Sequence, residues 1–169
     1  LRVAGDRLPR PYAARLARYR HGPGAVKVDW ALEGPIPWRA PACGQAATVH
    51  LGGSFEEIAL AERQAARGEL PARPFVLLAQ HTLFDGSRAP PGKHTAWAYA
   101  HVPQGWEGDA ALAAGAIEAQ VERFAPGFRE LVLHRAVRSP AVLERENPNL
   151  AGGDAGGGEN SLRQLLARP

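Results

Sequence analysis

The clearest candidate for ligand chemistry is a row of three side chains, Trp97, Tyr99 and His101, which alternate with alanines within the stretch 94–102. In an extended strand every second residue points to the same face. The alternation therefore predicts that the indole, phenol and imidazole rings line one face while the alanines line the other. Such a row could form the wall of a ligand site, and packing against neighbouring elements would explain the same pattern.

A second candidate is the glycine-rich run 152–158, which precedes a predicted final helix. Backbone N–H groups at the start of a helix bind anions. This run, however, follows a helix rather than a strand, it lacks a following Gly-Lys-Ser/Thr, and Asp154 and Glu159 would repel a phosphate. We interpret it as a flexible or closely packed loop rather than a nucleotide cradle, although glycines permit the close approach of a flat ligand.

Neither a metal site nor a catalytic nucleophile is predicted. His94 and His101 are separated by an odd number of positions on one strand, so their side chains point to opposite faces. Cys43, the only cysteine, has no adjacent histidine, and no Gly-x-Ser-x-Gly is present. Asp85 lies in a turn sequence, where aspartate serves backbone geometry. A single cysteine also excludes an internal disulfide and favours a reducing, cytoplasmic location.

The elements that would position these residues follow from periodicity and capping signals. Strands are predicted over 26–32, 48–51, 75–80, 94–102 and 131–137, and helices over 9–20, 54–67, 109–124, 139–147 and 160–167. Ser54 and Glu57 form a capping box, and Asp109 and Ser139 are N-cap residues. The connection through Pro90 is too short for a crossover helix, so the strands on either side should be antiparallel. The pattern predicts an α+β fold, with a mixed, largely antiparallel sheet of about five strands and helices packed on it.

Composition limits the partners of the protein. The 169 residues suit one domain, and no apolar run is long enough to span a bilayer. The net charge of +3 comes mainly from arginine, and several arginines surround the predicted helix 9–20. The aromatic residues of that helix, Tyr12 and Tyr19, lie with Leu16 on its apolar face, so no stacking platform for bases is evident. We interpret its arginines as a solvated surface and expect no nucleic-acid partner.

Three stretches together resemble the phytoene dehydrogenase-like family of FAD-dependent oxidoreductases. They are VKVDWALEGPIPW at 26–38; LFD at 83–85 with APPGKHT at 89–95, WAY at 97–99 and HVP at 101–103; and ERENPN at 144–149 with GGD at 152–154 and LRQLLARP at 162–169. Their order and spacing span nearly the whole chain. The resemblance is specific to the family and does not identify one substrate.

In that family an N-terminal G-x-G-x-x-G unit and a C-terminal glycine-rich segment hold FAD, and the region between them folds as a substrate domain over the isoalloxazine ring. The resemblance implies that residues 1–169 are this substrate-binding domain, without either FAD-binding segment, and that the domain is inactive alone. It implies a substrate cavity lined by Trp97, Tyr99 and His101. It also implies that Gly152, Gly153, Asp154 and Gln164 face the flavin. No catalytic residue is identified.

Further expectations concern the whole protein. The chain begins at Leu1 and contains no methionine, so we expect it to be part of a longer protein. The expected partner is a hydrophobic small-molecule substrate; peripheral membrane contact of the parent and a homodimer of this domain stay open. The alternative is a stand-alone ligand- or protein-binding module on the same scaffold without redox activity, because a fold does not dictate function.

Overall fold

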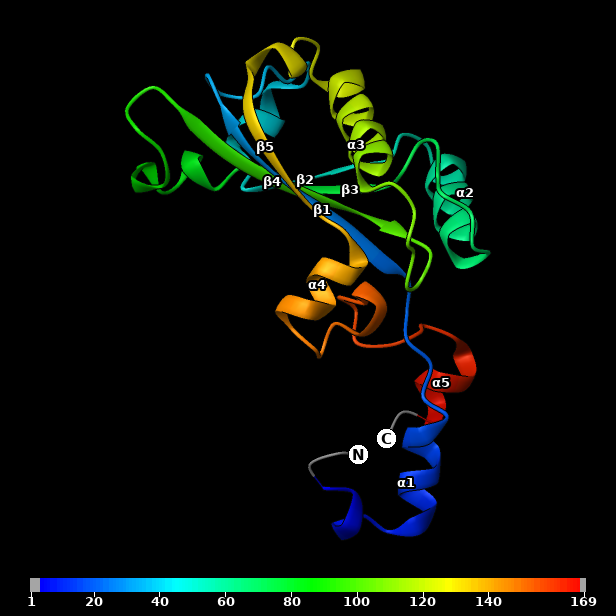
Figure 1. The fold of residues 1–169 in the computed structure, drawn as a ribbon. Helices are drawn as coiled ribbons and strands as arrows, with labels where there is room; N and C mark the ends of the chain where they lie inside the picture. Colours follow the sequence, from blue (N-terminus) through cyan, green and yellow to red (C-terminus); the bar gives the residue numbers. More distant parts are fainter. Residues whose placement is uncertain (1–3, 168–169) are drawn as a thin grey trace.

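A five-stranded antiparallel sheet forms the centre of the computed structural model, which describes residues 4–167 (Figure 1). The sheet has the order β2–β3–β4–β1–β5. Its strands are β1 (Gly24–Leu32), β2 (Thr48–Leu51), β3 (Val76–Ala79), β4 (His94–Val102) and β5 (Val132–Arg138). The predicted α+β fold is confirmed, and every neighbouring pair in this sheet is antiparallel.

One face of the sheet is covered by helix α3 (Ala110–Phe124), and the hydrophobic core lies between them. The small side chains of Ala96, Ala98 and Ala100 on β4 lie in this core, as the alternation predicts. Ile117 and Val121 of α3 are buried there, whereas Phe124 is only partly buried.

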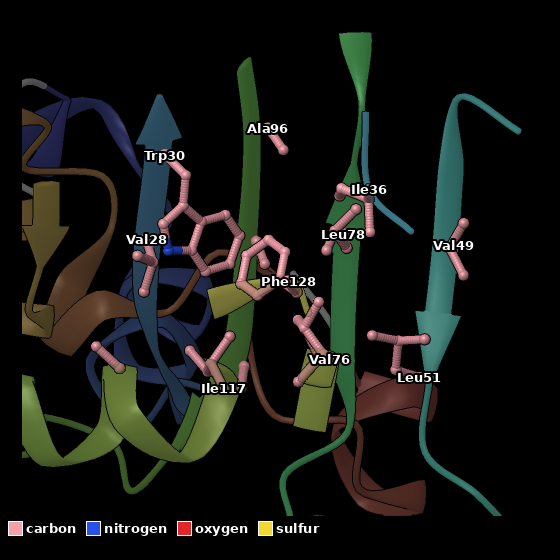
Figure 2. Close-up of a cluster of buried hydrophobic side chains, with 14 of the residues drawn as sticks. Val28, Trp30, Ile36, Val49, Leu51, Val76, Leu78, Ala96, Ile117 and Phe128 are labelled. Atoms are coloured by element: carbon pink, nitrogen blue, oxygen red, sulfur yellow. The ribbon is translucent and has the colours of Figure 1, made fainter. Parts of the chain in front are cut away.

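Bulkier groups fill the same layer. Figure 2 shows Trp30 of β1 beside Phe128. The two rings meet edge to face, with their centroids 5.1 Å apart. The indole N–H of Trp30 donates to Glu118 of α3 at 3.1 Å, and Arg135 of β5 pairs with the same carboxylate at 3.0 Å. Glu118 is therefore buried with its charge compensated, and the contacts connect α3 to two strands.

The predicted caps set the helix starts. Ser54 and Glu57 form the capping box of α2 (Phe55–Ala66). Asp109 caps α3, and Ser139 caps α4 (Pro140–Glu146). In each case the side-chain oxygen satisfies a backbone N–H that the first helical turn leaves without a partner.

Helices α1 (Arg10–Ala17) and α5 (Leu162–Ala167) lie next to each other and away from the sheet (Figure 1). Helix α1 is shorter than the predicted 9–20, and none of its residues is buried. The predicted apolar face of this helix therefore does not join the core, because the helix packs beside α5 rather than on the sheet. Within residues 4–167, no helix is long and apolar enough to cross a membrane.

Candidate binding face of the sheet

The three predicted site residues form a continuous row on the face of β4 opposite to α3. The rings of Trp97 and Tyr99 are stacked, with centroids 6.4 Å apart and an interplanar angle of 17°. The Tyr99 and His101 rings follow at 5.9 Å. All three side chains are half-buried, whereas the alanines between them are buried beneath α3.

An ionic cluster borders this row on the side of β1 and β5. Lys27 lies over the Trp97 ring, 5.4 Å from its centroid, and pairs with Asp29. Arg138 of β5 pairs with Asp29 at 2.7 Å and with Glu146 of α4 at 3.1 Å. Because two cations face two carboxylates, this border presents no net charge to a ligand.

The border on the side of β3 is apolar. Leu77 lies directly opposite Tyr99 in the sheet register, and Ala79 lies opposite Trp97. Further along, His50 of β2 packs edge to face against Phe75, with ring centroids 5.5 Å apart. The aromatic row therefore lies between two different borders. The border on the side of β3 is apolar, and the border on the side of β1 and β5 is a cluster of ion pairs without net charge.

Polar contacts fix the two ends of the row. At the α2 end, His101 Nδ1 lies 2.7 Å from a Glu62 carboxylate oxygen, which holds the imidazole in one orientation. At the other end, Thr95 contacts His81 Nε2 at 2.6 Å and Thr82 Oγ1 at 2.8 Å. Burial lowers the pKa of His81, which favours its neutral form.

The glycine-rich loop lies at the start of β1, apart from the aromatic row. Gly152 and Gly153 have φ of 60° and 81°, values that glycine adopts without strain. A Cβ on Gly153 would lie 2.7 Å from the Pro140 Cβ. Asp154 is 2% exposed; its carboxylate accepts N–H groups from Gly22 at 2.7 Å and Gly156 at 2.8 Å. Internal packing thus explains each residue type.

Gln164 lies in a separate contact. Its side-chain amide accepts the Arg20 N–H at 3.0 Å and donates to the Arg20 carbonyl at 2.7 Å. The structure therefore brings Gly152, Gly153 and Asp154 together. Gln164 lies apart from them and connects the segment before β1 to the segment after the loop. That these four residues face a flavin stays a prediction.

Several residues of the binding face escaped the sequence analysis. The alternation of β1 places Lys27 and Asp29 on its polar face, but only the strand pairing reveals that they border Trp97. Arg138 and Glu62 come from elements distant in sequence, and no local signal connects them to the row. Among residues 4–167, no group of three or more His, Cys, Asp or Glu could hold a metal ion.

No protein-family model matches the chain, and no curated protein is significantly similar to it.

Proposed function

We propose that this chain is the substrate-binding domain of a larger, phytoene dehydrogenase-like FAD-dependent oxidoreductase. In this proposal the row of Trp97, Tyr99 and His101 lines an apolar substrate cavity. The observation that carries the proposal is the row itself: three half-buried rings aligned on the sheet face that α3 leaves uncovered.

The chemistry of the face supports a ligand of low polarity. Aromatic side chains offer a large apolar area with few rotatable bonds, and ligand sites combine such walls with a few fixed polar groups. Here Leu77 extends the apolar area, while His101 is a polar group whose orientation Glu62 fixes. The ion pairs around Asp29 are mutually compensated, so they do not favour a charged substrate.

The described residues suit the substrate side of such an enzyme, with Gly152, Gly153, Asp154 and Gln164 predicted to face the flavin. The carboxylate of Asp154 and the amide of Gln164 already bond to the backbone of this chain, and the loop offers no phosphate cradle. In the proposal, FAD is held by segments of the parent protein outside this sequence. When bound, the flavin supplies the redox chemistry, and this chain contributes orientation of the substrate and exclusion of water.

The connection of the domain also supports the proposal. The segments that enter β1 and leave the glycine-rich loop run side by side, with the Glu159 N–H donating to the Arg20 carbonyl at 3.0 Å. Neighbouring entry and exit segments allow a domain to be inserted into another fold.

The test uses the intact parent protein with Trp97→Ala and Tyr99→Ala variants. We expect bound flavin in its absorbance spectrum and, for each variant, a roughly tenfold rise in KM for an apolar substrate, since each variant removes an aromatic contact. Leu112→Ala, at an exposed position of α3, is the control and should leave KM unchanged. An intact parent that binds no flavin contradicts the proposal and favours the stand-alone binding module.

A further inference from the structure

A concave surface lies away from the aromatic row, between α1 and the segment 159–164. It is a groove of about 570 Å³. Four of its lining residues are arginines: Arg15, Arg18, Arg20 and Arg163. Three of these precede β1 and the fourth lies in α5, so the fold brings together cations from near the two ends of the sequence.

The positive charge of the groove is largely uncompensated. Glu159 is the one carboxylate among the residues that line it. It lies 4.0 Å from Arg20, whose side chain is 72% exposed, and such a surface pair contributes little. In the part of the chain that the structure describes, Arg15, Arg18 and Arg163 form no ion pair. Bringing like charges together costs free energy, and an anion in the groove would offset that cost.

The groove has a framework that does not depend on the arginine side chains. Gln164 bonds both the N–H and the carbonyl of Arg20, which ties α5 to the chain beyond α1. The hydroxyl of Tyr19 donates to the Gly157 carbonyl and adds a second tie. These contacts hold the two sides of the groove at a set separation before any ligand arrives, which lowers the entropic cost of binding.

We propose that this groove binds a soluble small molecule that carries a diphosphate group. Guanidinium groups present paired N–H donors that match phosphate oxygens, and several around one groove suit a polyanion better than a single carboxylate. The volume is within the range of small-molecule sites. Tyr19 is the single aromatic residue lining the groove, so it does not suit the stacked bases of a nucleic acid. The site goes beyond the proposed oxidoreductase function and does not depend on it.

The test is isothermal titration calorimetry of the 169-residue chain with inorganic pyrophosphate at low ionic strength. We expect one saturable site. Arg18→Gln and Arg163→Gln, from opposite sides of the groove, should each weaken binding roughly tenfold, because each removes a charge-assisted hydrogen bond. Arg67→Gln, at the exposed end of α2, makes the same charge change outside the groove and should alter affinity by less than about twofold.

A second readout places the ligand. In amide NMR spectra, pyrophosphate should shift the signals of Tyr19, Ser161 and Gln164, and unchanged dispersion should show that the variants are folded. The proposal is overturned if no saturable binding occurs, if Arg67→Gln weakens binding as much as the groove variants, or if the shifts centre elsewhere. Binding to anionic lipid vesicles without binding to pyrophosphate would likewise overturn it, in favour of a membrane surface.

Discussion

Asp154 illustrates how a residue that suggests ligand chemistry in the sequence acquires a structural task in the fold. Its two carboxylate oxygens accept different N–H groups, one from Gly22 and one from Gly156. The first contact joins the glycine-rich loop to the chain before β1, and the second closes the loop on itself. Because the carboxylate itself is buried and both of its oxygens are hydrogen-bonded, it stabilises the junction between distant segments.

We expect Asp154→Asn to destabilise the protein by about 1–3 kcal/mol, because an amide can accept from only one of these N–H groups and turns a donor toward the other. Urea unfolding at neutral pH measures the change. Asp6→Asn, at an exposed position in the short 3-10 helix Gly5–Arg7, is the matched control. Equal unfolding midpoints for the two variants would contradict the role assigned to Asp154.

Glu57 gives a prediction about pH. Its pKa is lowered from 4.5 to about 2, chiefly by its hydrogen bond to Arg123 of α3 and also by the Ser54 N–H. A depressed native pKa means that the ionised group stabilises the fold above pH 4.5 and loses this contribution as the pH falls toward 2.

Glu57→Gln retains a capping side chain but removes the charge. The variant should therefore unfold at lower urea concentration than the wild type at pH 7, and the difference should shrink at pH 3. Glu69 is an exposed residue that follows α2. Glu69→Gln should therefore show no such pH dependence. A difference that is constant over this range would disprove the electrostatic origin.

Strand β4 separates the hydrophobic core from the candidate binding face, because its two faces meet different surroundings. Ala98 is fully buried under α3, while the neighbouring Tyr99 is half-buried on the open face. The alternation in sequence predicts this division, since side-chain direction in a strand has a period of two.

We expect Ala98→Leu to destabilise the chain by about 1–3 kcal/mol through overpacking against α3, and Tyr99→Leu to cost clearly less. Thermal or urea unfolding of the two variants makes the comparison. A larger loss for Tyr99→Leu would mean that the aromatic row serves the core of the fold rather than a ligand.

Local signals predicted most of the elements but not how they are arranged. The caps at Ser54, Asp109 and Ser139 and the alternation in β1 and β4 depend on neighbours in sequence, so the pattern reveals them. The pairing of β5 with β1 and the convergence of α1 with α5 depend on contacts between residues far apart. The arginines before β1 illustrate this limit: in sequence they resemble a solvated helix face, and only the fold places Arg163 beside them.

At the scale of the whole molecule, the two candidate surfaces are well separated. The aromatic row lies on β4, while the arginine groove is lined by residues of α1, α5 and the segments next to them. Figure 1 shows α1 and α5 away from the sheet. In the proposed function, only the sheet face would meet the substrate. In the strand order, the two long strands β1 and β4 are neighbours inside the sheet, and they contribute most of the candidate binding face.

The substrate wall can be tested by hydroxyl-radical footprinting that compares the 169-residue chain with the longer parent protein proposed above. If Trp97 and Tyr99 face an enclosed cavity in the parent, their oxidation rates should fall several-fold there, while the exposed Leu133 of β5 should react at a similar rate in both. Equal rates at Trp97 and Tyr99 in the two proteins would show that the face stays open to solvent, and the assignment of a substrate wall would fail.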